Sequence, residues 1–223
     1  MEEIKIYVAN TESLRDASVF ERLFSTLGEE RRARIESKKR EEDKRLSLGA
    51  ELLLRFALEK EGIFSYSVKR DENGKPYLAG DKSLFFNLSH SKSRVMCVLS
   101  DRAVGCDVQW MDPSVSLSVA DRFFLDEECA LIRSQKTEAA RRLMFYRIWS
   151  LRESFVKATG LGLWRTSKSF SVMPAEEGYL SHGIDRSMPS HFCEPCREAE
   201  YRYAVCGERE RFAPVEWIFL EKL

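Results

Sequence analysis

The chain has 223 residues, enough for one large domain or two small ones with a substantial hydrophobic core. Its 36 basic residues equal its 36 acidic residues, so net charge provides no general attraction to nucleic acid or an anionic membrane. Six cysteines lack the spacing of a small disulfide-rich secreted domain, so reduced thiols are expected. The acidic N-terminus does not resemble a secretion signal and no stretch is apolar enough to span a membrane, which predicts a cytoplasmic protein.

The first half of the chain shows strand and helix patterns in turn. Apolar residues alternate from Ile4 to Val8, as in a half-buried strand, and a short helix is expected from an N-cap at Ser13 to Gly28. Residues 29–45 include eight basic and six acidic residues, which favours a solvated helix over a nucleic-acid arm. An apolar helix is expected at 46–58, and extended segments at 66–68, 75–78, 85–91, 95–99 and 104–109.

The second half begins with a linker at residues 110–118, which contains Pro113 and three serines. Two helices are expected at 120–135 and 138–158, and strands at 170–173, 179–180, 201–205 and 215–220. Each half therefore has helices early and strands late. This order predicts an α+β protein with two lobes of similar size, residues 1–110 and 111–223.

Several polar residues stand in apolar surroundings. Asp107 follows Val-Gly-Cys, and Gln109 lies two residues further on, on the same face of one strand. Glu153 and Lys157 are one helical turn apart and share a face. Because Mg²⁺ prefers carboxylate and amide oxygens, Asp107, Gln109 and Glu153 are candidate metal ligands. For Glu153 and Lys157 alone, an ordinary surface salt bridge is the alternative.

Three short blocks follow one another in the chain. They are FNLSHS at 86–91, VGCDVQ at 104–109 and WSLRESFVK at 149–157. Gly74-Lys75-Pro76 lies upstream, and Arg122-Phe123-Phe124 with Glu128 lies between the last two blocks. In order and spacing, these segments resemble the conserved blocks of the Sfp-type 4′-phosphopantetheinyl transferases. The resemblance covers nearly the whole chain, and three ordered blocks are a specific signal.

The resemblance implies a fold of two similar α/β lobes related by pseudo-two-fold symmetry, with coenzyme A in the cleft between them. It also implies a monomeric, Mg²⁺-dependent enzyme that moves the 4′-phosphopantetheine arm of coenzyme A to a serine of an apo acyl or peptidyl carrier protein. The other product is 3′,5′-ADP. For such a displacement at phosphorus, a protein has to position the reacting groups and neutralise the charge on the phosphate oxygens.

The resemblance also implies a role for each residue of the site. Asp107 and Glu153 hold the metal with the pyrophosphate, Glu153 is the base for the serine hydroxyl, and Lys157 contacts the phosphates. The remaining contacts to coenzyme A are Ser89 and His90 at the 3′-phosphate, Lys75 and Pro76 at the adenine end, and Arg31 and Arg45 as further phosphate contacts.

The chain departs from the family pattern at Gln109, where many relatives have a carboxylate, which predicts a more weakly held metal. Arg152 replaces a lysine and keeps its charge, and Trp149 is expected to serve in packing. Two alternatives remain open: another Mg²⁺-dependent nucleotide phosphotransferase or phosphohydrolase, and a non-catalytic module that binds coenzyme A or a carrier. Cys193 and Cys196 have the spacing of zinc ligands, but no second pair accompanies them, which disfavours a zinc site.

Overall fold

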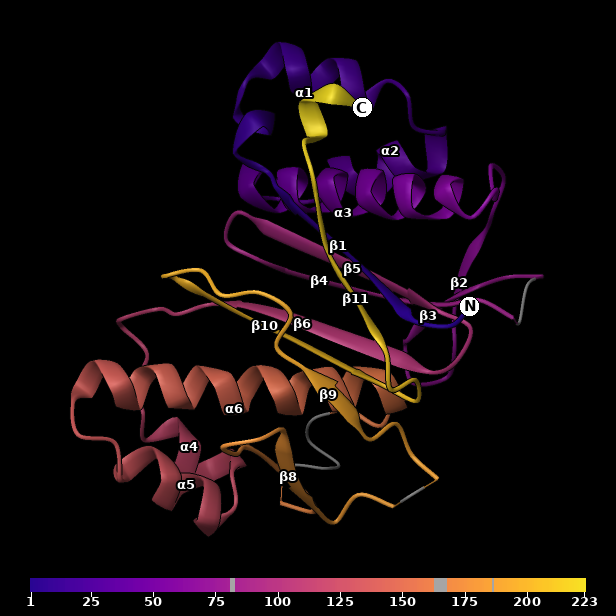
Figure 1. Cartoon of the computed structure of the whole chain (residues 1–223). Coiled ribbons are helices and arrows are strands. Elements are labelled where there is room, and N and C mark those ends of the chain that lie inside the picture. The colour runs from indigo at the N-terminus through magenta and orange to yellow at the C-terminus, as the bar shows by residue number, and fades with distance from the viewer. Residues whose placement is uncertain (81–82, 163–167, 186) are drawn as a thin grey trace.

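A computed structural model describes residues 1–80, 83–162, 168–185 and 187–223. The molecule is built in layers of helices and sheets, and two sheets lie between helices on either side (Figure 1). The predicted α+β class with two lobes is confirmed. The helices are α1 (Ala17–Phe24), α2 (Glu29–Glu36) and α3 (Glu41–Lys60) on one side, and α4 (Val119–Phe123), α5 (Asp126–Arg133) and α6 (Glu138–Thr159) on the other.

The first sheet has four strands in the order β11-β1-β5-β4 among the described residues. β1 pairs parallel with β11 and antiparallel with β5, and β5 pairs antiparallel with β4. The strands are β1 (Ile4–Asn10), β4 (Phe85–Ser91), β5 (Arg94–Ser100) and β11 (Phe212–Ile218). β1 therefore lies inside the sheet, which explains its nearly continuous burial.

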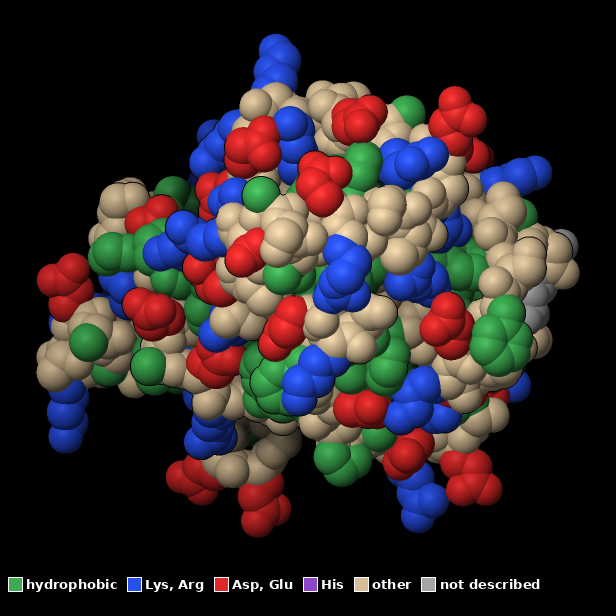
Figure 2. Space-filling model, turned by 90° about the horizontal axis from the view of Figure 1, so that it is seen from above, with side chains coloured by type: hydrophobic (Ala, Val, Ile, Leu, Met, Phe, Trp, Pro, Cys, Tyr) green, Lys and Arg blue, Asp and Glu red, His purple; other side chains and the backbone are tan. Residues whose placement is uncertain are grey.

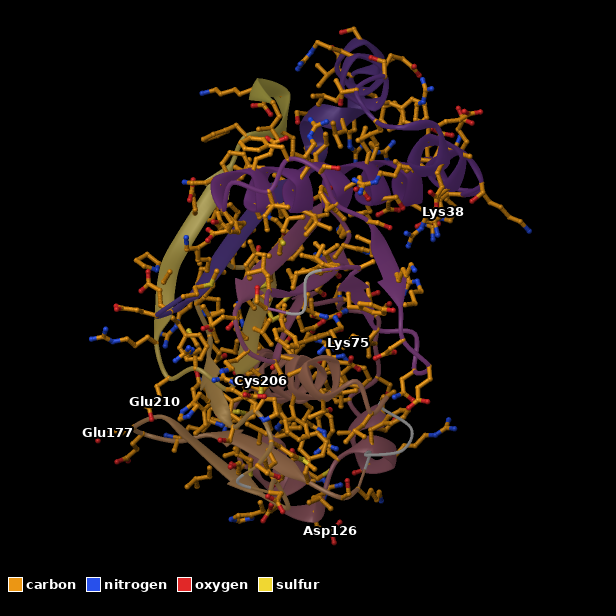
Figure 3. All side chains as sticks on the ribbon, turned by 90° about the vertical axis from the view of Figure 1, so that its right-hand side faces the viewer. Lys38, Lys75, Asp126, Glu177, Cys206 and Glu210 are labelled. Atoms are coloured by element: carbon orange, nitrogen blue, oxygen red, sulfur yellow. The ribbon has the colours of Figure 1, made fainter. Side chains whose placement is uncertain are left out.

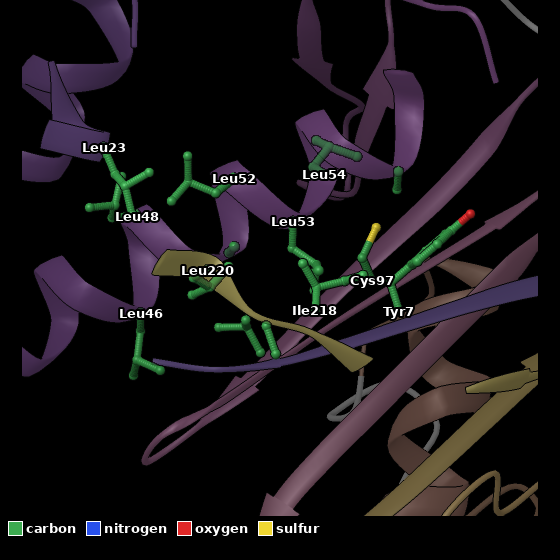
Figure 4. Close-up of a cluster of buried hydrophobic side chains, with 14 of the residues drawn as sticks. Tyr7, Leu23, Leu46, Leu48, Leu52, Leu53, Leu54, Cys97, Ile218 and Leu220 are labelled. Atoms are coloured by element: carbon green, nitrogen blue, oxygen red, sulfur yellow. The ribbon is translucent and has the colours of Figure 1, made fainter. Parts of the chain in front are cut away.

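The core of the first lobe lies between this sheet and α3. Leucines of α3 pack over Tyr7, Cys97 and Ile218 of the sheet, together with Leu23 of α1 (Figure 4). The buried leucines of α3 are Leu46, Leu48, Leu52, Leu53, Leu54 and Leu58. Burial of each such side chain stabilises the fold by about 1.5–3 kcal/mol. The apolar helix predicted at 46–58 is therefore the main support of the sheet.

The second sheet has the strand order β6-β10-β9, all antiparallel, and α6 covers its outer face. Its strands are β6 (Val104–Trp110), β9 (His191–Cys193) and β10 (Tyr201–Gly207). Two separate two-stranded ribbons are also described. One pairs β2 (Val68–Arg70) with β3 (Pro76–Leu78), and the other pairs β7 (Ser171–Pro174) with β8 (Tyr179–His182). Apolar residues of β1, β5, β6 and β10 form a core between the sheets.

The sheets exchange strands between the two halves of the sequence. β6 precedes residue 110 but pairs with β10, and β11 follows it but pairs with β1. Neither sheet is thus built from one half of the chain alone. The division into residues 1–110 and 111–223 stays a prediction.

Two predicted helix boundaries are wrong for local reasons. The N-cap of α1 is Asp16, whose carboxylate accepts hydrogen bonds from the amides of Ser18 and Val19, while Ser13 lies in a 3₁₀ turn (Glu12–Arg15). The charged segment at 29–45 is not one helix. α2 ends at Glu36, and α3 begins at Glu41 with three acidic residues in its first turn, which favours a new helix start.

The outer surface of the layer formed by α1, α2 and α3 presents charges of both signs. Figure 2 shows basic and acidic side chains interspersed over this face. Local ion pairs such as Lys44 with Glu41 contribute to this mixture. Residues 29–45, predicted to be a solvated helix, are mostly exposed, although they form parts of two helices. None of the described helices is long and apolar enough to cross a membrane.

Candidate active site

A glycine on β6 allows α6 to lie directly against this strand. A β-carbon at Gly105 would come within 2.2 Å of both the carbonyl oxygen of Ser154 and the amide nitrogen of Ala158. Because side chains alternate along a strand, Asp107 and Gln109 share this face of β6. The glycine therefore brings the last turns of α6, which include Lys157, to the carboxylate of Asp107.

Asp107 is the centre of a buried hydrogen-bond cluster. Its side-chain oxygen Oδ1 accepts hydrogen bonds from Lys157 Nζ at 2.7 Å and from Ser89 Oγ at 3.0 Å. Lys157 Nζ also donates to Ser89 Oγ at 2.9 Å. Asp107 is 4% exposed, while the side chain of Lys157 is 28% exposed. The structure thus brings together three of the predicted site residues, from β4, β6 and α6.

The other oxygen of Asp107, Oδ2, has a different environment. Oδ2 is buried and has no hydrogen-bond partner within the described part of the chain. Glu153 lies one turn before Lys157 on α6 and is close enough for the charge of Asp107 to act on its pKa. The described segments contain no group of three or more His, Cys, Asp or Glu residues arranged so that they could hold a metal ion by themselves. Two carboxylates and the Gln109 amide fit Mg²⁺, which keeps water or substrate oxygens in its other positions.

The charges of the cluster shift the pKa values of its members. Burial and the charge of Asp107 raise the pKa of Glu153 to about 7, against the opposing effect of Lys157. Burial acts to lower the pKa of Lys157, but Asp107 and Glu153 outweigh it, and the pKa is raised above its ordinary value. At neutral pH the lysine is therefore charged, and both the protonated and the ionised form of Glu153 are populated.

His90 lies on the opposite face of β4 from Ser89, with part of its surface exposed and the rest covered by neighbouring residues. Partial burial and the positive charges of Lys157 and Lys38 lower the pKa of His90, while Asp43 opposes them. Lys38 follows α2 and lies on the first lobe (Figure 3). Positive charge from both lobes thus acts at His90, and Lys38 is a contributor that the sequence patterns did not single out.

Lys75 binds the end of α6. Its Nζ donates to the carbonyl oxygen of Ala158 at 2.5 Å and approaches that of Val104 at 3.4 Å. A cation at this place stabilises the negative end of the helix dipole. Burial lowers the pKa of Lys75 to about 8. Lys75 lies in the middle of the molecule (Figure 3), and Pro76 begins β3 beside it.

Arg31 and Arg45 have other neighbours in this structure. Arg31 donates to Glu51 and to the hydroxyl of Tyr66 and stacks over the Tyr66 ring. Arg45 lines a separate hollow between α1 and α3, with Glu21 and other side chains. The described contacts do not bring either arginine to Asp107 or Lys157.

A buried ion pair anchors α6 next to Glu153. Arg152 donates to both carboxylate oxygens of Glu128 at 2.8 and 2.9 Å and to the carbonyl of Phe170 at 2.6 Å, and the side chains of the pair are 1% and 0% exposed. Sequence reasoning missed this role. The signal was the spacing of Arg152 from Ile148 and Phe155, which places it on a buried face of α6.

Aromatic packing completes the anchor between α6 and α4. Trp149 contacts the rings of Phe123, Phe124 and Phe145, as predicted for a packing residue. Phe124 is 2% exposed, so these contacts lie in a closed core. Together with the ion pair of Arg152, these contacts hold α6 in place beside Glu153.

Two family models match the chain. The 4′-phosphopantetheinyl transferase superfamily matches residues 103–206, and the N-terminal 4′-phosphopantetheinyl transferase model matches residues 15–101. A 4′-phosphopantetheinyl transferase of Bacillus subtilis is 29% identical over 216 residues, 94% of each chain. The 4′-phosphopantetheinyl transferase psf-1 of Bacillus pumilus is 30% identical over 92% of this chain and 91% of its own. The 4′-phosphopantetheinyl transferase Sfp of Bacillus subtilis strain 168 is 30% identical over 86% of this chain and 87% of its own.

Proposed function

The chain belongs to the 4′-phosphopantetheinyl transferase superfamily, and we propose that the cluster around Asp107 carries its reaction. The enzyme transfers the 4′-phosphopantetheine arm of coenzyme A to a serine of a carrier protein. The observation that supports this site is the buried carboxylate of Asp107, which has one oxygen held by Lys157 and the other without a partner in the described part of the chain.

Asp107, Glu153 and Gln109 would hold Mg²⁺ together with the pyrophosphate of coenzyme A. The bound ion would neutralise charge that develops on the phosphate oxygens during transfer. Oδ2 of Asp107 and the carboxylate of Glu153 supply the negative charge, and the Gln109 amide supplies a neutral oxygen. With a neutral third ligand, the site should need more magnesium than one with three carboxylates.

Glu153 is the proposed base. Its pKa is raised to about 7 in the metal-free protein, and its carboxylate would accept the proton of the incoming serine hydroxyl, directly or through water. The serine oxygen forms a bond to the phosphorus that bears the pantetheine arm. The pyrophosphate bond breaks at the same phosphorus, and 3′,5′-ADP leaves with the bridging oxygen.

Lys157 and His90 are proposed to bind the phosphates. The raised pKa of Lys157 keeps its ammonium charged beside the pyrophosphate. His90 would donate a hydrogen bond to the 3′-phosphate, and its pKa is lowered in the unliganded protein by burial and by Lys157. Ser89 would orient the Lys157 ammonium by the hydrogen bond between them. A phosphate contact by Arg31 or Arg45 has less support, because Arg31 contacts Tyr66 and Arg45 lines the hollow between α1 and α3.

Lys75 and Pro76 are proposed to line the adenine end of coenzyme A through their backbone and the proline ring. The ammonium of Lys75 is already engaged by Ala158 at the end of α6. The carrier is proposed to be an apo acyl or peptidyl carrier protein. We further infer that the enzyme acts as a monomer in the cytoplasm.

The proposal is tested by incubating the protein with coenzyme A, Mg²⁺ and a set of apo carriers. Mass spectrometry should show the arm on the carrier serine. Asp107→Ala and Glu153→Ala should each lower kcat by at least about a hundredfold, because each removes a group that acts on the reacting phosphate. No transfer to any carrier, or wild-type rates in either variant, contradicts the assignment. Nucleotide hydrolysis without a carrier would support the alternative phosphohydrolase.

A further inference from the structure

Strands β4 and β6 belong to different sheets, yet side chains of β4 bind the backbone along one edge of β6. The amides of Cys106, Val108 and Trp110 donate to Asn87 Oδ1 at 2.9 Å, Ser89 Oγ at 3.1 Å and Ser91 Oγ at 3.0 Å, in that order. We call these three side chains the β4 ladder. The ladder joins the two sheets with the residues of a single sequence block, FNLSHS.

The ladder follows from the alternation of both strands. Asn87, Ser89 and Ser91 are on one face of β4. Asn87 and Ser89 pair with Val98 and Met96 of β5, which pack into the core between the sheets. The amides of β6 point alternately to its two edges, so one set faces β10 and the other faces the ladder. Each of these donors would cost about 1–3 kcal/mol if it were buried without an acceptor.

The ladder brackets the two proposed metal ligands of β6. Asp107 lies between the amides held by Asn87 and Ser89, and Gln109 lies between those held by Ser89 and Ser91. Asn87 is itself 4% exposed, so its carbonyl group has little freedom to move. The backbone on both sides of each proposed ligand is therefore held by side chains of β4, a strand of the other sheet.

We propose that Asn87 and Ser91 are positioning residues for the metal site. They hold β6 so that the oxygens of Asp107 and Gln109 face α6 at a set place, and this role rests on the proposed function. The sequence block that ends in Ser91 thus acts on the metal site through the backbone of β6. Outer partners of this kind typically change metal affinity by about 10–100-fold when they are removed.

The experiment compares Asn87→Ala and Ser91→Ala with Ser91→Thr, which keeps an acceptor hydroxyl. Ile218→Val is the stability control, because it removes a methyl group from the core between the first sheet and α3, to which β6 does not contribute. For each protein, the Mg²⁺ concentration for half-maximal transfer is measured. Binding of Mn²⁺, as a paramagnetic substitute, is titrated by electron paramagnetic resonance with coenzyme A present, and Tm is recorded.

We expect the two alanine variants to require about tenfold more Mg²⁺ and to bind Mn²⁺ about tenfold more weakly. Ser91→Thr should stay within about twofold of the wild type, and Ile218→Val should lower Tm without a change in metal affinity. Lower Tm with unchanged metal affinity in both alanine variants overturns the positioning role. If instead Asp107→Ala binds Mn²⁺ as the wild type does, the metal assignment itself is wrong, whatever the ladder variants show.

Discussion

Gly105 lies so close to Ala158 that a β-carbon on the glycine would come within 2.2 Å of the alanine amide nitrogen. Gly105→Ala should therefore move α6 away from β6 and separate Lys157 from Asp107. We expect the substitution to reduce the free energy of unfolding by at least about 1–3 kcal/mol. Transfer activity should fall even in the molecules that remain folded, which urea denaturation and mass spectrometry would measure.

The matched control for Gly105→Ala is Gly28→Ala. A β-carbon at Gly28 meets no atom within 4 Å, and the φ of −65° is accessible to alanine. Because Gly28 is the N-cap of α2, where alanine is less favourable, this control should lose at most about 1 kcal/mol of stability and keep native activity. If Gly105→Ala behaved as this control does, close contact between β6 and α6 would not be a requirement of the site.

The pKa of Glu153 predicts a pH dependence of stability in the absence of metal. Its value of about 7 in the folded protein exceeds the ordinary value of 4.5, so the folded state binds the proton more tightly. The contribution of this carboxyl to stability is full below pH 4.5 and is lost as pH rises through 7. Glu153→Gln removes this loss, so the variant should be more stable than the wild type at pH 8.

The measurement is urea denaturation in EDTA at pH 5 and pH 8. The stability difference between Glu153→Gln and the wild type should grow between these values. Glu177→Gln removes an exposed carboxylate from the turn between β7 and β8 and should leave the pH dependence unchanged. Parallel curves for Glu153→Gln and the wild type would show that burial does not raise the pKa of Glu153.

The residues that carry the chemistry of this site are easier to predict from sequence than the contacts that hold those residues in place. Glu153 and Lys157 share a helix face because they are four residues apart. Their sequence block is also one of the three that carry the family resemblance. The support depends on contacts between residues far apart in the chain, such as Arg152 with Glu128 and Lys75 with Ala158. Local periodicity says which face of an element is buried, but it does not say which distant polar group that face will meet.

The helix starts show the same limit on a smaller scale. Ser13 and Asp16 are both good N-caps by residue type, and only the hydrogen bonds of Asp16 decide between them. The exchange of β6 and β11 between the halves was likewise invisible to local patterns, because strand pairing here joins residues about half a chain or more apart. Fold class was predictable because it depends only on the order of elements.

Gln109→Glu should lower the Mg²⁺ concentration required for half-maximal transfer. The substitution adds a third carboxylate on the face of β6 that holds Asp107, and divalent affinity rises with the number of charged ligands. We expect a change of roughly tenfold, measured by transfer assays across Mg²⁺ concentrations. An unchanged requirement would exclude Gln109 from direct contact with the ion.

Arg152→Met should reduce the free energy of unfolding by about 3–5 kcal/mol, because it leaves the carboxylate of Glu128 buried without its cation. The exposed pair of Arg133 with Asp121 provides the control, since loss of such a pair costs at most about 1 kcal/mol. Urea denaturation of Arg152→Met and Arg133→Met measures both losses.

The double variant Glu128→Leu/Arg152→Met should recover part of the stability lost in Arg152→Met, because no unpaired charge then remains. If Arg152→Met and Arg133→Met lost the same free energy of unfolding, the buried ion pair would contribute no more to stability than the exposed one.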